Sequence, residues 1–84
     1  MIITWDDAKR LANLDKHGLD FADLDEAFFE NSLVVSAKKR RLMAIGRSKR
    51  GLIVVVFVTM GEEAVSVISM RPASPLERKR YANR

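Results

Sequence analysis

The sequence contains no cysteine and a single histidine, and only 7% of its residues are aromatic. Without cysteine the chain forms neither disulfides nor thiolate metal sites, and one histidine excludes a multi-histidine site within one chain. With so few aromatic rings available, Trp5 is assigned to the core rather than to a stacking surface. No apolar run approaches the ~20 residues of a membrane-spanning helix, and the acidic start differs from a secretory signal. We therefore expect a cytoplasmic protein without metal or other cofactor.

What the chain does contain is enough apolar residues to fold and an uneven charge distribution. Its 84 residues are 48% hydrophobic and 31% charged, which predicts one folded domain over residues 1–84. The net charge of +4 combines −5 over residues 1–30, from eight acids and three bases, with +9 over residues 31–84, from twelve bases and three acids. Such a basic region favours nucleic-acid binding. A surplus of charge that merely keeps the protein soluble explains it equally well.

Two helices are predicted in the first thirty residues. The first covers residues 6–17, with Asp6 as its cap and Gly18 after its end. The second runs from Asp20 to about residue 30. On the first helix the apolar arc, which is expected to face the core, consists of Ala8, Leu11, Ala12 and Leu14. The opposite, polar arc consists of Lys9, Asn13, Lys16 and His17.

The rest of the chain predicts a four-stranded antiparallel sheet and a final helix. Short connections join apolar, β-branched runs at residues 33–35, 42–45, 52–59 and 65–70. The third run is apolar on both alternating faces, which predicts a central strand. Ser74 and Pro75, with Glu77 three residues after the serine, mark the start of the last helix. The fold class is therefore α+β, with a helical layer on one face of the sheet.

Cationic and polar side chains dominate the candidates for chemistry. The four glycines stand singly, so no phosphate-binding glycine loop is present. Arginine can clamp phosphate oxygens, while histidine, glutamate or lysine can take a proton from a ribose 2′-hydroxyl. Cleavage of RNA by this route needs no metal. The candidates are Lys9, Asn13, Lys16, His17, Arg40, Arg41, Arg47, Lys49, Arg50, Arg71, Glu77, Arg78 and Tyr81.

Several of these candidates also have a structural interpretation. His17 stands at the end of a predicted helix, where a protonated ring interacts favourably with the helix dipole. Glu77 is the expected capping-box partner of Ser74. The basic run at residues 38–41 is typical of a solvated turn. Tyr81 can pin the last helix to the sheet.

Two patterns near the ends of the chain resemble those of one protein family. The first pattern is Trp5-Asp6, Lys9, Asn13, Lys16-His17-Gly18 and Phe21, and the second is Ile68-Ser69-x-Arg71-x-Ala73-x-x-x-Glu77-Arg78-x-x-Tyr81. Together they resemble the BrnT toxins of type II toxin–antitoxin systems. The resemblance implies a RelE-like fold and an endoribonuclease that arrests translation. It also implies a BrnA-type ribbon-helix-helix antitoxin, and operator DNA bound only through the toxin–antitoxin complex.

The resemblance also suggests roles for the matching residues. Arg71, with Lys9 or Arg78, is expected to hold the scissile phosphate. His17 or Glu77 is expected to act as the base, and Tyr81 or a cation to assist the leaving group or stack on a base. The expected RNA contacts are Asn13, Lys16, Arg40, Arg41, Arg47, Lys49 and Arg50. The alternative function is a non-catalytic module that binds nucleic acid or an antitoxin through its basic surface.

Overall fold

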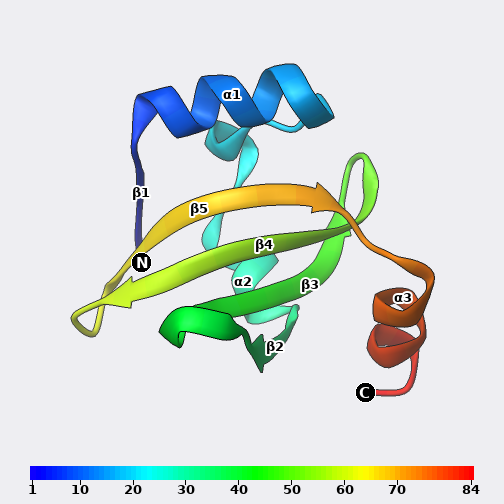
Figure 1. Cartoon of the computed structure of the whole chain (residues 1–84). Helices are drawn as coiled ribbons and strands as arrows, with labels where there is room; N and C mark the ends of the chain where they lie inside the picture. Colours follow the sequence, from blue (N-terminus) through cyan, green and yellow to red (C-terminus); the bar gives the residue numbers. More distant parts are fainter.

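The computed structural model describes all 84 residues and contains one five-stranded sheet with three α-helices and two short 3₁₀ turns (Figure 1). The predicted α+β class is confirmed, but there are five strands rather than four. In chain order the elements are β1 (Ile2–Trp5), α1 (Asp7–His17), η1 (Phe21–Asp23), α2 (Glu26–Glu30), β2 (Leu33–Ser36), η2 (Lys38–Arg40), β3 (Leu42–Ser48), β4 (Gly51–Met60), β5 (Ala64–Pro72) and α3 (Pro75–Ala82).

The sheet is mixed rather than antiparallel throughout. Its strand order is β1-β5-β4-β3-β2, so β4 lies at the centre, as its apolar sequence predicted. Strands β2 to β5 pair antiparallel, whereas β1 pairs parallel with β5, from Ile2 opposite Ala64 to Trp5 opposite Val67. Strand β1 was not predicted, because its partner lies some sixty residues away and no local turn precedes the pairing.

The second predicted helix is broken into two short pieces. Leu24 and Asp25 adopt extended backbone angles between η1 and α2. The Asp25 carboxylate accepts a hydrogen bond from the backbone N–H of Phe28 at 2.8 Å, and Asp20 accepts one from Ala22 at 2.9 Å. Each aspartate thus caps its own short helical piece, and a continuous helix from Asp20 to residue 30 is wrong.

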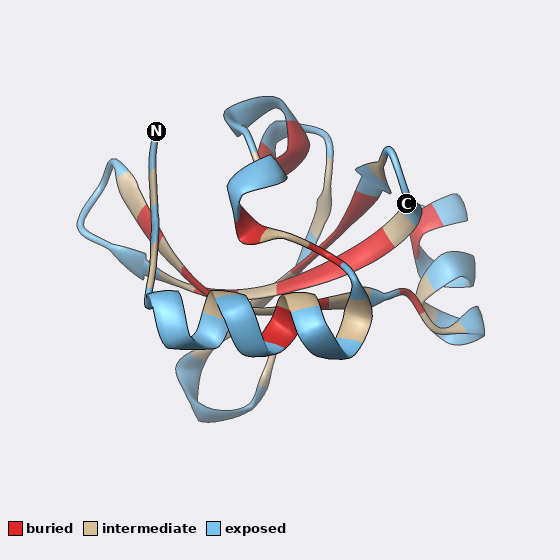
Figure 2. Ribbon diagram, turned by 90° about the horizontal axis from the view of Figure 1, so that it is seen from above, coloured by how far each residue is buried: buried red, intermediate tan, exposed pale blue.

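Apolar side chains are buried on both faces of the sheet. Figure 2 marks the buried residues in red along the strands. On one face Ile53 and Val55 of β4 lie in a cluster that includes Phe21 and Phe28. The alternate residue of β4, Val54, belongs to a second cluster that includes Tyr81 of α3. Because alternate residues of a strand point to opposite faces, α3 covers the face opposite to η1 and α2. The prediction of helices on one face only is therefore wrong.

The orientation of α1 is also different from the prediction. Its ends are as expected, with Asp6 capping the first turn and Gly18 following the last. However, Leu11 of the expected apolar arc is 57% exposed, whereas Asn13 of the polar arc is only 8% exposed. Strand β1 pairs with β5 only as far as Val67, and α1 lies along the edge of β5 beyond that point. A strand edge carries free backbone N–H and C=O groups, so a polar helix face suits it better than an apolar one.

None of the helices combines the length and the apolar character needed to cross a membrane.

Candidate active site

A small groove lies between α1 and the C-terminal half of β5. It has a volume of about 420 Å³, and we call it the small groove. The polar arc of α1 forms one side and β5 the other; the lining residues are Lys9, Ala12, Asn13, Lys16, His17, Ile68, Ser69, Met70 and Arg71. Five of the thirteen sequence candidates are thereby brought together, although Arg71 is more than fifty residues from the others along the chain.

Asn13 fixes the position of α1 against β5. Its side-chain oxygen accepts a hydrogen bond from the backbone N–H of Met70 at 3.0 Å. Its side-chain nitrogen donates to the backbone carbonyl of Leu19 at 3.2 Å, in the segment that follows the helix. Both polar groups of the buried amide are therefore engaged within the protein. The backbone groups of Met70 and Leu19, which the sequence did not mark as functional, hold the site together.

Arg71, which lines the small groove, forms an ion pair with Glu77. Two guanidinium nitrogens of Arg71 donate to the two carboxylate oxygens of Glu77, at 2.7 and 2.8 Å. This bidentate arrangement lowers the pKa of Glu77 to about 2, from an ordinary value of 4.5, and raises that of Arg71. Glu77 is thus ionised at neutral pH and a weak base.

The start of α3 holds Glu77 in place. The backbone N–H of Ser74 donates to Glu77 Oε1 at 2.8 Å, and the Ser74 hydroxyl accepts from the backbone N–H of Glu77 at 3.2 Å. The predicted capping box is therefore confirmed, with Pro75 in the first helical turn. One carboxylate both caps α3 and orients Arg71, so the position of the guanidinium depends on the start of this helix.

His17 is the last residue of α1 and is half-buried at the small groove. The following Gly18 has a φ of +67°, a left-handed conformation that few side chains adopt without strain, and its backbone N–H donates to Leu14. The helix therefore ends at His17, and the imidazole lies at its C-terminus. His17, Lys16 and Lys9 lie on the same side of the groove, opposite Arg71.

Tyr81 lies away from the small groove. It is 6% exposed and packs with Ile45 and Val54, which matches the interpretation that it pins α3 to the sheet. The guanidinium of Arg84 lies 3.7 Å from the centre of the Tyr81 ring. Arg84 was not among the sequence candidates; it lies just beyond the end of α3, and its guanidinium also donates to the backbone carbonyl of Tyr81 at 2.7 Å. Arg78 is exposed on the outside of α3.

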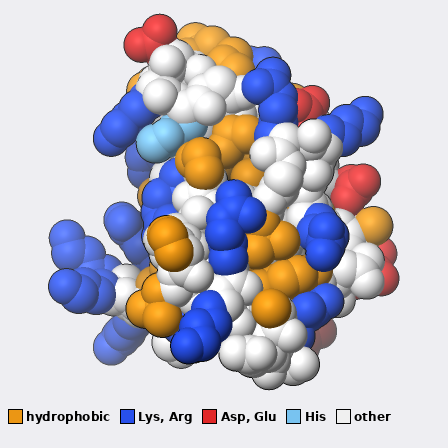
Figure 3. Space-filling model, turned by 90° about the vertical axis from the view of Figure 1, so that its right-hand side faces the viewer, with side chains coloured by type: hydrophobic (Ala, Val, Ile, Leu, Met, Phe, Trp, Pro, Cys, Tyr) orange, Lys and Arg blue, Asp and Glu red, His pale blue; other side chains and the backbone are white.

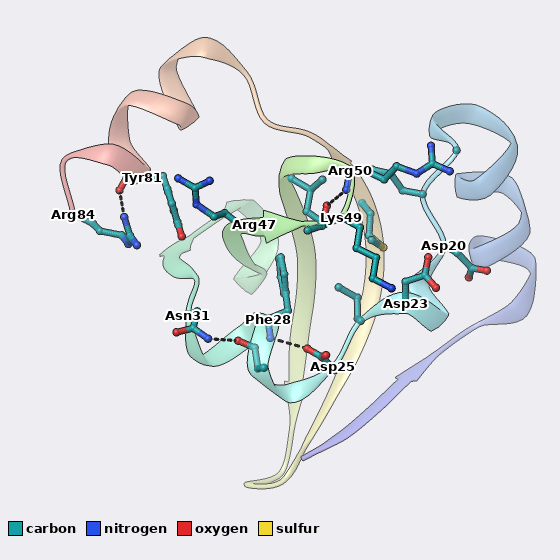
Figure 4. A pocket seen from close by; sticks show the side chains of 17 residues that line it. Asp20, Asp23, Asp25, Phe28, Asn31, Arg47, Lys49, Arg50, Tyr81 and Arg84 are labelled. Atoms are coloured by element: carbon teal, nitrogen blue, oxygen red, sulfur yellow. Dashed lines mark hydrogen bonds between the residues drawn. The ribbon is translucent and has the colours of Figure 1, made fainter.

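Basic residues of the β3–β4 hairpin line a second, larger groove (Figure 4), and Met70 lines this groove as well as the small one. Lys49 and Arg50 form the two-residue turn, and Ser48 holds it by donating to the carbonyl of Gly51 at 2.9 Å. Arg47 precedes the turn, and its side chain lies near Tyr81 in Figure 4. These three candidates do not line the small groove.

Arg40 and Arg41 line neither groove. They lie at the start of β3, at the opposite end of that strand from the hairpin (Figure 1). The sequence alone could not separate them from the hairpin cations, because both groups flank the same strand.

Lysine and arginine side chains are spread over the end of the molecule that carries the small groove. Figure 3 shows this end of the molecule, with the single histidine at upper left and the acidic side chains at the margins. Such a surface attracts polyanions. No three His, Cys, Asp or Glu side chains lie close enough together to hold a metal ion.

The fold and the small groove define a small basic α+β protein that presents an imidazole beside cations, a combination suited to binding a phosphate group. Residues 5–77 match the model of the family described as the ribonuclease toxin BrnT of type II toxin–antitoxin systems. The chain belongs to this family.

A solved structure agrees with this family. The chain is 53% identical in sequence to the Brucella abortus ribonuclease toxin BrnT, known from a crystal structure at 1.1 Å resolution. The match covers 88% of this chain and 97% of the other, with a TM-score of 0.81. Comparison with curated protein sequences gives no match. Membership of the family implies an RNA substrate and an antitoxin partner.

Proposed function

We propose that residues 1–84 form a single toxin domain that cleaves RNA in the small groove without a metal ion. The observation that carries the proposal is the meeting of His17 and Arg71, from distant parts of the chain, in one groove that also contains Lys9 and Lys16. In the reaction the ribose 2′-oxygen forms a bond to phosphorus as the bond from phosphorus to the 5′-oxygen breaks. The products are a 2′,3′-cyclic phosphate and a 5′-hydroxyl.

His17 takes the proton from the 2′-hydroxyl in this proposal. Imidazole is the side chain best matched to proton transfer near neutral pH. Glu77 is less suited, because its carboxylate already accepts hydrogen bonds from Arg71 and Ser74 and its pKa is about 2. Glu77 acts instead as a positioning residue for Arg71.

Arg71 binds the phosphate and stabilises the negative charge that builds up in the transition state. Its side chain is 38% exposed, so a phosphate oxygen can reach the guanidinium while Glu77 still holds it. Lys9 or Lys16 supplies further positive charge and the proton for the departing 5′-oxygen. Arg78, exposed on α3, binds a phosphate of the RNA outside the small groove. Tyr81 packs α3 against the sheet and does not contact the reacting atoms.

The remaining basic residues guide RNA to the groove. Arg47, Lys49 and Arg50 at the hairpin, and Arg40 and Arg41 at the far end of β3, raise the local concentration of RNA without taking part in the chemistry. Asn13 is a positioning residue, since its amide is used within the protein to hold α1 against β5.

Cleavage of a defined RNA by the purified protein tests the mechanism, with EDTA present to remove metal ions. We expect Arg71→Ala and His17→Ala each to lower the cleavage rate at least about a hundredfold. The matched control is Lys79→Ala, an exposed cation of α3 that lines neither groove, and it should cleave normally. Equal cleavage by all variants would contradict the mechanism. Salt-sensitive RNA binding without any cleavage would favour the non-catalytic alternative.

The cellular consequences follow from RNA cleavage. We propose that the toxin acts in the cytoplasm and arrests translation, and that a BrnA-type ribbon-helix-helix antitoxin neutralises it. The toxin–antitoxin complex, rather than the toxin alone, then binds operator DNA. Expression of the chain without its antitoxin should arrest growth, and expression of Arg71→Ala should not.

A further inference from the structure

The second, larger groove has two oppositely charged walls. It has a volume of about 900 Å³ and lies between η1 and α2 on one side and the β3–β4 hairpin and the end of α3 on the other (Figure 4). Asp20, Asp23 and Asp25 line the first side, which we call the acidic wall. Arg47, Lys49, Arg50 and Arg84 line the second side, which we call the basic wall. We call the space between them the large groove.

The two walls face each other without closing. None of the four cations of the basic wall forms a salt bridge, although three carboxylates lie across the groove. Asp20 is paired with Arg10 of α1 instead. In Figure 4 the Lys49 side chain points toward Asp23. The free protein thus holds separated charges of both signs, which a second chain bound in the groove can pair with.

The floor between the walls is apolar. It contains Leu24, Phe28, Ile53 and Met70, which join the main core cluster. Phe28 and Met70 are buried beneath the groove, whereas Leu24 is half-exposed at its acidic side. An occupant therefore needs apolar side chains for the floor, acidic groups for one wall and basic groups for the other.

We propose that the large groove is the docking site for a segment of the antitoxin, with acidic side chains against the basic wall and a basic side chain against Asp23. This inference rests on the proposed toxin function for the existence of the partner. It adds the surface and the charge pattern of the segment. Because Met70 lines both grooves, an antitoxin held there is anchored beside the small groove.

RNA suits the large groove less well than a protein segment does. A polyanion is attracted to the basic wall but repelled by Asp23 and Asp25, the two aspartates opposite that form no salt bridge. A peptide can carry both charge signs in the required order. A substitution in the acidic wall therefore separates the two occupants. Asp23→Lys removes a repulsive charge for RNA and removes an attractive one for the antitoxin.

The experiment measures binding of a BrnA-type antitoxin by isothermal titration calorimetry. All toxin variants carry Arg71→Ala, so that their production does not depend on neutralisation. Asp23→Lys reverses a charge of the acidic wall, and Lys49→Glu reverses one of the basic wall. The matched controls are Glu62→Lys in the β4–β5 turn and Lys79→Glu on α3, which line neither groove. All four positions are exposed, and circular dichroism checks that each variant is folded.

We expect both groove variants to weaken antitoxin binding about tenfold or more, with both controls within about threefold of the parent. Asp23→Lys should at the same time strengthen RNA binding. Groove variants that bind like the controls, or an antitoxin that does not bind the parent, would overturn the proposal. So would a loss confined to RNA binding in Lys49→Glu, which would assign the large groove to RNA.

Cleavage assays keep this proposal separate from the catalytic one. The Asp23→Lys variant of the otherwise unchanged chain should cleave RNA at the normal rate, and added antitoxin should inhibit it less than it inhibits the unchanged chain. A failure of the parent chain to cleave RNA would count against the catalytic mechanism, and the calorimetric result would still decide the docking site.

Discussion

At the scale of single residues, the ion pair between Arg71 and Glu77 connects stability with the candidate site. One carboxylate accepts from the guanidinium and from the start of α3, so it serves two elements at once. Removing its charge should loosen both the arginine and the helix. The pair is only partly exposed on the Glu77 side, which limits screening by solvent.

Replacement of Glu77 by glutamine should lower the free energy of unfolding at pH 7 by about 1–2 kcal/mol after allowance for solvent screening. A carboxyl whose pKa is lowered on folding stabilises the protein above its ordinary pKa. That stabilisation is lost as the pH falls from about 4.5 to about 2. The difference between wild type and variant should therefore shrink over this range. Thermal unfolding at several pH values measures it, and a difference independent of pH would contradict the assignment.

Replacement of Asn13 by alanine should cost about 2–4 kcal/mol, because it leaves the Met70 N–H and the Leu19 carbonyl without partners. Hydrogen exchange at the Met70 amide should accelerate more than at Val54 in the centre of the sheet. Asn13→Asp keeps the acceptor and should protect the Met70 amide better than alanine does. Leu11→Ala, at an exposed position of the same helix, is the control and should change little.

At the scale of elements, local signals predicted the helix ends better than the helix faces. Asp6, Gly18 and Ser74 act within a few residues of their own position, so their caps were readable from sequence. The burial of Asn13 depends on Met70, fifty-seven residues away, and nothing near Asn13 indicates it. For the same reason the sequence supplied the candidates for the small groove without showing which of them meet.

The contact between α2 and β3 should be sensitive to small added volume. A Cβ atom at Gly46 would lie 3.0 Å from the Phe28 ring and would overlap the Ser32 hydroxyl. Gly46→Ala should therefore destabilise the protein by about 1–3 kcal/mol. In a double-mutant cycle, Ser32→Ala should reduce that cost by removing the overlapping oxygen. Chemical denaturation measures all four proteins, and strictly additive costs would argue against the clash.

At the scale of the whole molecule, the charge asymmetry of the sequence becomes a spatial one. The acids of the first thirty residues include the acidic wall, and the later bases cover the end with the small groove and the far end of β3. The surface therefore attracts RNA from several sides, whereas the proposed mechanism places cleavage in the small groove alone. Its binding and its cleavage should depend on different residues.

Replacement of Arg40 and Arg41 by alanine should weaken RNA binding and reduce its salt dependence, by about one unit of slope for each phosphate that the variant no longer neutralises. The cleavage rate at saturating RNA should stay unchanged, because these arginines lie outside the small groove. Filter binding across a salt series, with single-turnover cleavage beside it, separates the two effects. A lower saturating rate would place these residues in the reaction itself.

Because β1 pairs only with β5, it cannot join the sheet until β5 has been synthesised. Thr4 donates to the carbonyl of Val65, 61 positions later, and β1 has no other strand partner. Closing so long a loop is slow compared with forming the hairpins. A chain still on the ribosome therefore lacks both its edge strand and its small groove until the last strand has emerged. Under the proposed mechanism the nascent chain therefore cleaves no RNA, and this delay gives an antitoxin time to bind before the toxin becomes active.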